Sequence, residues 1–168
     1  GEWPDLDLYD PTELNTEQQI ELAKRVEAAA MSMDERVTNS EGADFDSSSG
    51  RVVLGNSHGF LGEYQSSSFS MSVSPVATDS QTGAMQRDSW YDVQRKFAKL
   101  DSPEAVGLEA ARRTVRKLGA KKVATQRVPV VFDAETAGSL MGNLCSAVSG
   151  YSLYKGASFL AGQLDKPL

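Results

Sequence analysis

The sequence has almost none of the residues from which proteins build metal centres and disulfides. Among 168 residues there is one cysteine, Cys145, and one histidine, His58. A single cysteine excludes an internal disulfide, and one imidazole with one thiolate cannot complete a tetrahedral zinc site. The Asp-x-Asp-x-Asp-Gly spacing of a calcium loop is missing too, and the pair Asp44 and Asp46 is too sparse to replace it. The sequence therefore offers no evident metal site of its own.

Long apolar runs are also missing. No stretch is long and apolar enough for a membrane-spanning helix, and none has the pattern of a signal peptide, so neither is expected. The apolar content of 40% and the charged content of 24% are ordinary for a soluble globular protein. A chain of this length suits one domain with a buried core. Together with the unpaired cysteine, these features predict a protein of the reducing cytoplasm that does not contact membranes.

An excess of positive charge is lacking, since the net charge is -6. Nucleic-acid binding requires a clustered surplus of lysine and arginine to neutralise phosphates. The only basic run, from Arg112 to Lys122, is typical of a solvated helix face with cations near the helix C-terminus. The composition therefore argues against direct binding to nucleic acid.

A serine-nucleophile motif is missing as well, because no Gly-x-Ser-x-Gly elbow occurs. A metal-independent hydrolase that uses His58 with Ser57 or another serine stays open as an alternative, although a serine-rich chain always offers such pairs. A structural interaction module without a substrate is a further alternative. Cys145 lies on the apolar stripe of a predicted helix without a nearby cation, which predicts a small buried hydrophobe rather than a nucleophile.

The apolar periodicity predicts amphipathic helices. Residues 1–15 are acidic and contain proline, which predicts a linker or lead-in. Thr16 is expected to cap the first helix in a capping box with Gln19. Ser102 and Pro103 are expected to start a second helix, which Gly119 ends. The first stripe is Leu22, Val26, Ala29 and Met33, and the second is Leu108, Ala111, Val115 and Leu118.

The middle of the chain is rich in strand signals. The strand candidates are residues 37–45, 50–54, 63–75 and 84–93, with turns predicted at residues 47–50 and 57–59. Residues 68–74 alternate strictly, so Phe69 and its apolar neighbours share one face while serines share the other. Trp90 and Tyr91 are expected to point to opposite faces. The short connections predict an antiparallel β-meander packed with amphipathic helices, which is an α+β fold.

The last third begins with an apolar strand, predicted over residues 128–132. A helix over residues 134–149 follows, and Gly150 is expected to end it. Beyond it, only residues 158–164 look helical. The helix has a broad apolar face, and such a face favours association if it is exposed. This face consists of Ala137, Leu140, Met141, Leu144, Cys145 and Val148.

Four segments resemble the TldE/PmbA branch of the TldD/PmbA peptidase family, and the resemblance extends from about residue 16 to residue 160. It implies that residues 16–165 are a central α+β region, with the family's N-terminal and C-terminal regions absent. The segments are Asn56-Ser57-His58-Gly59-Phe60, Gly83-Ala-Met-Gln-Arg-Asp88, residues 128–133 and Lys155-Gly-Ala-Ser-Phe159.

In the TldD branch the matching helix carries the zinc-binding pattern His-Glu-x-x-x-His. On this chain the pattern falls on Gly142, Asn143 and Ala147, none of which supplies an imidazole or a carboxylate. The resemblance thus implies a non-catalytic subunit without a cofactor, paired in a cytoplasmic heterodimer with a TldD-like subunit that holds the zinc. Such pairs are associated with the proteolysis of unfolded peptides, the maturation of a peptide antibiotic and the degradation of an antitoxin. The family's old label, modulator of DNA gyrase, gains no support here as DNA binding.

Two segments are candidates for contact with the partner or a peptide. The turn formed by Asn56, Ser57, His58 and Gly59 is either a local structural turn or a contact loop. The second segment is the hydroxyl face of Ser68, Ser70 and Ser72. This face either meets solvent or allows another backbone to approach, for example by addition of a peptide strand to the sheet.

Overall fold

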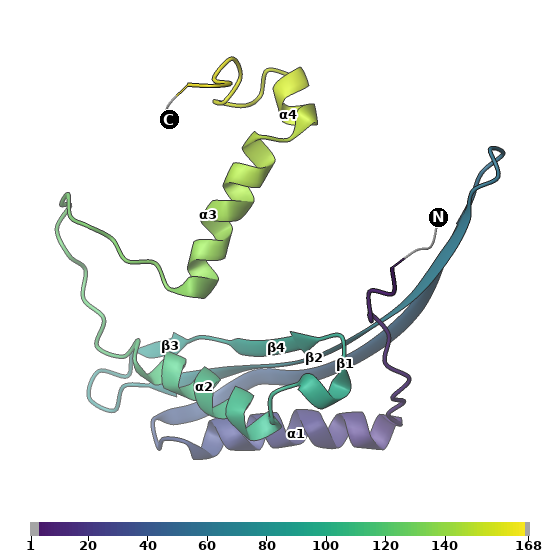
Figure 1. Ribbon diagram of the computed structural model, residues 1–168. Coiled ribbons are helices and arrows are strands. Elements are labelled where there is room, and N and C mark those ends of the chain that lie inside the picture. The colour runs from purple at the N-terminus through teal and green to yellow at the C-terminus, as the bar shows by residue number, and fades with distance from the viewer. Residues whose placement is uncertain (1–3, 167–168) are drawn as a thin grey trace. The chain divides into compact units, whose positions relative to one another are not determined.

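The computed structural model describes residues 4–166 of the chain. A four-stranded antiparallel sheet carries two helices on one face (Figure 1). Its two long strands, β1 (Val37–Gly55) and β2 (Leu61–Thr78), pair along almost their whole length. The short strands β3 (Met85–Arg87) and β4 (Trp90–Gln94) both pair with β2 on its other side. The α+β prediction with an antiparallel meander is confirmed, and β2 is the central strand.

The predicted alternation along β2 is confirmed. Phe69, Met71 and Val73 are buried on the face that the helices cover, whereas the serines between them are half-buried on the other face. The core contains these side chains together with Val26 and Val106 from the two helices. The sheet therefore has one face packed on helices and one open face within this part of the chain.

Two predicted strand boundaries are wrong. β1 continues through residues 47–50, where a turn was expected, because these residues pair with residues 66–69 of β2. Cross-strand pairing satisfies their backbone groups and so overrides the turn preference of serine and glycine. The strand predicted at residues 84–93 is instead split into β3 and β4. Between them, Asp88 accepts a hydrogen bond from the Lys117 ammonium at 2.9 Å.

Helix α1 (Thr16–Ser32) forms as expected, but its N-cap is Asn15 rather than Thr16. The Asn15 side chain accepts a hydrogen bond from the backbone of Gln18, and the Gln18 side chain accepts one from the backbone of Asn15, both at 2.9 Å. The capping box therefore exists one residue earlier than predicted. Val26 of the predicted stripe is fully buried.

Helix α2 (Pro103–Val115) begins at the predicted cap, where the Ser102 hydroxyl accepts a hydrogen bond from the backbone of Ala105. The predicted apolar stripe is partly wrong, because Leu108 is 46% exposed. Small residues of α2, such as Gly107 and Ala110, are buried instead. The helix ends before Leu118, and Gly119 then adopts a φ of 72°, which its lack of a side chain permits. The buried residues of α2 are Pro103, Val106, Gly107, Ala110, Ala111 and Thr114.

The structure divides the chain into two compact units, Gly1–Lys121 and Lys122–Leu168. The central α+β region expected from the sequence over residues 16–165 includes residues of both units. Residues 120–133, which join the units, carry no helix or strand. The strand predicted at residues 128–132 is therefore wrong. A strand needs a hydrogen-bonded neighbour, and no strand of residues 122–166 provides one.

The second unit contains helix α3 (Ala134–Ala147) and the short helix α4 (Gly150–Tyr154). Gly150 starts α4 rather than ending α3, and residues 158–164 form turns instead of the expected helix. The apolar face of α3 is exposed, and so is Cys145, which was predicted to be buried.

Asp34, in the turn between α1 and β1, is expected to titrate with a pKa of about 2. Hydrogen bonds from the Arg36 side chain and backbone lower this pKa from its usual 3.8. Because the folded-state pKa lies below the unfolded one, the stabilisation by Asp34 is fully present above pH 4 and is lost as the pH falls toward 2. NMR titration of the carboxyl carbon should give this midpoint. Replacing Arg36 with methionine should return the midpoint to near 4, and an unchanged midpoint would contradict the assignment.

Candidate functional site

The segment from Asn56 to Gly59 forms the turn at the end of the β1–β2 hairpin, far from α1 and α2 (Figure 1). The Asn56 carboxamide oxygen accepts hydrogen bonds from the backbone of His58 and of Phe60, at 3.0 and 3.2 Å. Gly59 has a φ of 85°, a conformation that favours glycine. Asn56 and Gly59 thus account for the turn by local geometry, while the Ser57 and His58 side chains are exposed.

The hydroxyl face of β2 lies in the middle of the sheet. Ser70 is paired with Asp46 on one side and with Val93 on the other, and Ser72 is likewise paired on both sides. Ser68 is paired with Ser48 of β1. Addition of a peptide strand requires a free edge, so it cannot take place at residues 69–73. The serine face is open to contact by side chains but not by a β-ladder.

The two predicted contact segments are not brought together. Seven residues of extended strand separate Leu61, beside the turn, from Ser68, a distance of about 23 Å at ~3.3 Å per residue. The hydrogen bond that His58 donates comes from its backbone. No contact between His58 and a serine hydroxyl is recorded among residues 4–166. The serine-hydrolase alternative therefore gains no geometric support.

The three positions of the zinc pattern lie on α3 but do not converge. Residues 142 and 147 are five apart, which on a regular α-helix separates their directions by about 140°. Gly142 is exposed, whereas Ala147 is only 9% exposed. The Asn143 amide donates a hydrogen bond to the backbone oxygen of Ser139 at 3.0 Å. The donor set does not fit zinc: a hydrogen, a carboxamide bound to its own helix and a methyl cannot ligate it.

Metal-binding clusters are also absent elsewhere in the described chain. Over residues 4–166, no three histidine, cysteine, aspartate or glutamate side chains gather where they could hold an ion. In the same range, no helix combines the length and the apolar character needed to cross a bilayer.

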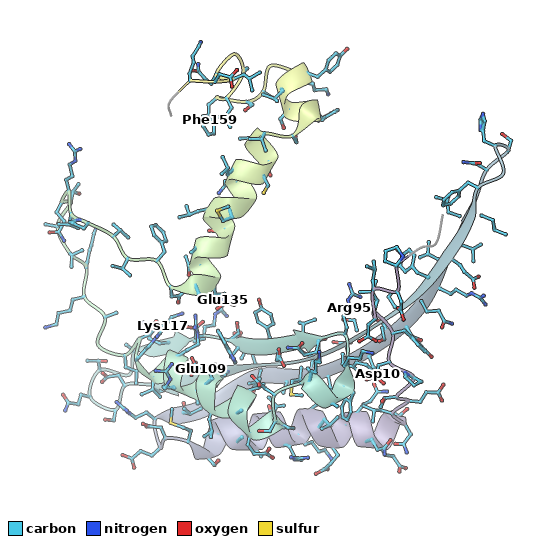
Figure 2. The ribbon with its side chains drawn as sticks, viewed as in Figure 1. Asp10, Arg95, Glu109, Lys117, Glu135 and Phe159 are labelled. Atoms are coloured by element: carbon cyan, nitrogen blue, oxygen red, sulfur yellow. The ribbon has the colours of Figure 1, made fainter. Side chains whose placement is uncertain are left out.

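The basic run near the C-terminal end of α2 is engaged in ion pairs. Arg112 pairs with Glu109 at 2.8 Å, and Lys117 pairs with Asp88 (Figure 2). The hydrogen bond from Arg112 is the main cause that lowers the pKa of Glu109. Arg113 stacks on the ring of Trp90 at 4.5 Å. The interpretation of the run as a solvated helix face holds only in part: the Arg112 side chain is exposed, whereas the Arg113 side chain is 16% exposed and packs within the first unit.

Trp90 and Tyr91 point to opposite faces, as expected. Trp90 packs against the core, whereas Tyr91 is half exposed on the open face. Stacking on nucleic-acid bases would need both rings on one accessible surface. This arrangement gives no such platform.

The lead-in segment is bound to the sheet rather than detached from it. Ser67, which is 2% exposed, is the centre of this contact. Its backbone N–H donates to the oxygen of Leu8 and its hydroxyl accepts from the backbone of Asp10, at 3.0 and 2.9 Å. The same hydroxyl donates to the backbone oxygen of Arg95 at 2.8 Å. Sequence reasoning missed Ser67. The signal was its place in the inward-facing series of β2, where a serine needs buried partners.

The Asp10 carboxylate makes a second contact between the lead-in and the rest of the first unit. It accepts hydrogen bonds from Thr12 and, at 2.8 Å, from the backbone of Phe97. These bonds lower the pKa of Asp10, the hydroxyl of Thr12 making the largest contribution. Lys96 adds an ion pair with Asp7 and donates to the oxygen of Tyr9. The lead-in therefore has a defined course beside β2.

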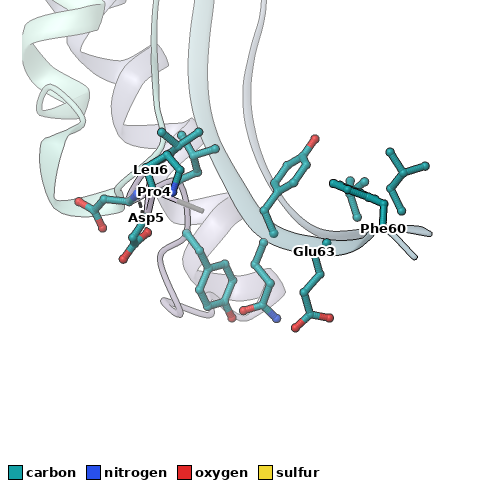
Figure 3. Close-up of a pocket in the computed structure, with 13 residues that line it drawn as sticks. Pro4, Asp5, Leu6, Phe60 and Glu63 are labelled. Carbon is teal, nitrogen blue, oxygen red and sulfur yellow. Dashed lines mark hydrogen bonds between the residues drawn. The ribbon is translucent and has the colours of Figure 1, made fainter. Parts of the chain in front are cut away.

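A groove of about 870 Å³ lies between the lead-in and the β1–β2 hairpin (Figure 3). Sequence reasoning did not find it, because residues distant in the sequence form its two walls. The Phe60 ring lies over Gly62, where a Cβ atom would be 3.1 Å from the ring. Most of the residues that line the groove are apolar, and three carboxylates also line it. The lining residues include Leu6, Leu8, Val52, Leu54, Phe60 and Tyr64, with Asp5, Asp7 and Glu63 as the carboxylates.

Comparison with known proteins gives consistent matches. The model of the PmbA/TldA metallopeptidase central domain matches residues 9–118, and that of the PmbA/TldA metallopeptidase C-terminal domain matches residues 125–168. The chain is 42% identical to Metalloprotease PmbA of Escherichia coli O157:H7 over 98% of its own length and 36% of the relative. It is 40% identical to a Metalloprotease PmbA homolog of Haemophilus influenzae, over 97% of its own length and 36% of that relative. The chain thus spans about a third of the length of these relatives.

A solved structure shows the same fold. The crystal structure of a putative modulator of a DNA gyrase from Thermotoga maritima superposes with a TM-score of 0.89. The likeness covers 99% of this chain and 38% of that one, at 23% sequence identity. The boundary between the two matched family domains, between residues 118 and 125, coincides with the boundary between the two compact units.

Proposed function

Because the chain belongs to the PmbA/TldA metallopeptidase family, we propose that it acts as a non-catalytic subunit of a peptidase complex. In this proposal a TldD-like partner holds the zinc and cleaves the peptide. This chain pairs with the partner and helps to enclose an unfolded peptide, in a reducing cytoplasmic compartment. Peptide-antibiotic maturation and antitoxin degradation are the processes in which such a pair would work.

Helix α3 provides the single observation that supports the non-catalytic part of the proposal. The positions that would carry His-Glu-x-x-x-His are Gly142, Asn143 and Ala147. Their side chains offer no imidazole and no carboxylate, so the zinc and the base that activates water have to come from elsewhere. The exposed apolar face of α3 agrees with a subunit that is covered by another surface.

A reconstitution experiment tests the proposal. The purified chain, a TldD-like protein and their mixture are each incubated with a fluorogenic unstructured peptide, and cleavage rates are compared at equal zinc. We expect the mixture to cleave the peptide at least ten times faster than either protein alone. Metal analysis of the pure chain should find far less than one zinc per molecule. Stoichiometric zinc on this chain together with proteolysis by it alone would refute the proposal, as would full-rate cleavage by the partner alone.

A further inference from the structure

One edge of β2 is unpaired beside the groove. Backbone N–H and C=O groups alternate between the two sides of an antiparallel strand. Since Ser67 donates its N–H away from β1, to Leu8, the groups of Gln65, Glu63 and Leu61 also point away from β1. On that side β4 pairing begins only at Phe69. Within residues 4–166 no backbone partner is recorded for these three residues on the groove side, so they offer three donors and three acceptors.

The same edge of β2 already binds the lead-in at Ser67, two residues beyond Gln65. Leu8 of the lead-in accepts the hydrogen bond of the Ser67 backbone, and Asp10 donates to the Ser67 hydroxyl. This contact has the chemistry of strand addition, but it stops where the lead-in diverges from β2 to form the far wall of the groove. The free edge from residue 61 to residue 65 would accept a strand of about five residues, or ~16 Å.

The groove favours one kind of chain. Its apolar lining suits aliphatic or aromatic side chains, which follow one another at every second position in an extended peptide. The carboxylates of Asp5, Asp7 and Glu63 repel acidic peptides, although Asp7 and Glu63 have cationic neighbours in Lys96 and Arg51. A two-stranded ribbon is marginally stable alone, so a third strand also stabilises the hairpin.

We propose that residues 61–65 of β2 bind an extended, non-acidic peptide by strand addition, with its apolar side chains in the groove between the lead-in and the hairpin. The occupant is the unfolded polypeptide substrate, so this inference rests on the proposed function. It places the peptide beside residues 61–65, a stretch of β2 that has no paired strand on the side away from β1 among the described residues. It thereby replaces residues 68–74, which the sequence had suggested.

Fluorescence anisotropy tests the site with the full chain. The probe is a labelled nine-residue peptide of alternating valine and threonine with a lysine at each end. We expect saturable binding, and at least tenfold weaker binding when every interior amide of the peptide is N-methylated, because methylation removes the donors of the ladder. A glutamate-ended version of the peptide should also bind more weakly. Equal binding of the methylated peptide would refute strand addition without any change to the protein.

Two proline variants locate the edge. Gln65→Pro removes a donor on the groove side and should weaken binding at least tenfold. Val53→Pro is the matched control: Val53 pairs with Glu63 on the same hairpin, but its N–H points to the opposite, outer edge of β1. It should bind the peptide as the unaltered chain does, and circular dichroism should show that both variants are folded.

The outcomes separate this inference from the proposed function. Equal losses in both variants, or none in Gln65→Pro, would refute the edge at residues 61–65. If Gln65→Pro abolished assembly with a TldD-like partner but left peptide binding intact, the edge would bind the partner and the inference would be wrong. In either case the dependence of cleavage on this chain could still hold, and the reconstitution experiment measures that dependence separately.

Discussion

Replacing Gly107 with alanine is expected to destabilise the first unit by ~3 kcal/mol, near the upper end of the usual cost of overpacking. Gly107 lies where α2 crosses α1. A Cβ atom at this position would be 2.4 Å from the backbone oxygen of Val26 and 2.9 Å from the backbone nitrogen of Ala30. These are backbone atoms, so no side-chain rotation can relieve the clash and the two helices would have to separate. Urea unfolding followed by circular dichroism measures the loss.

The matched control for this substitution is Gly50→Ala in β1. Gly50 has no atom within 4 Å of the added Cβ and does not have a positive φ. Its free energy of unfolding should change by less than ~0.5 kcal/mol or rise slightly. If Gly107→Ala were as stable as Gly50→Ala, the close contact between α1 and α2 would be incorrect.

Replacing Phe69 with alanine should cost ~3 to 5 kcal/mol, the usual range for removing a buried phenylalanine. Phe69 is 2% exposed. Its ring meets the edge of Phe97 with the centroids 5.6 Å apart, and Phe97 in turn contacts Phe45 at 6.3 Å. The loss therefore includes ring contacts as well as buried area. Phe97 belongs to a short 3₁₀ helix, Phe97–Lys99, that closes this end of the core.

Ser70→Ala is the control for Phe69→Ala, because Ser70 is one residue away on the opposite face of β2. Its side chain is half-buried on the open face and has no recorded hydrogen bond, so the expected change in unfolding free energy is below ~0.5 kcal/mol. Thermal unfolding of both variants checks the pair. Similar losses would mean that the two faces of β2 are not distinct.

The elements governed by one strong local signal were predictable from the sequence. The strict alternation around Phe69 determined which face of β2 is buried, and Ser102 with Pro103 determined the start of α2. The boundaries that failed depend on partners distant in the sequence. Residues 47–50 look like a turn until β2 lies beside them, and residues 128–132 look like a strand but have no strand to pair with in the described chain.

The contact between α1 and α2 and the groove beside the lead-in show a second limit of prediction from sequence. The periodicity favoured Leu108, a large apolar residue, yet α2 packs through Gly107 and its small neighbours because α1 approaches so closely. Hydrophobicity scales give little weight to such residues. The groove could not be predicted, because the lead-in at Leu8 meets β2 at Ser67 only in the folded chain. The directions in which the zinc-pattern positions point from α3 follow from the helix geometry and not from the residue types alone.

The order of the elements along the chain has a consequence for biosynthesis. The β1–β2 hairpin leaves the ribosome before α2, which is needed to cover the inner face of β2. At its far end Val52, Val53 and Leu54 remain exposed even after folding, on a ribbon with open edges. Such edges recruit other nascent chains. The yield of correctly folded protein should therefore depend on what is synthesised beside it. Chaperones or a co-translated partner protein would cover the far end of the β1–β2 hairpin until α2 has been synthesised.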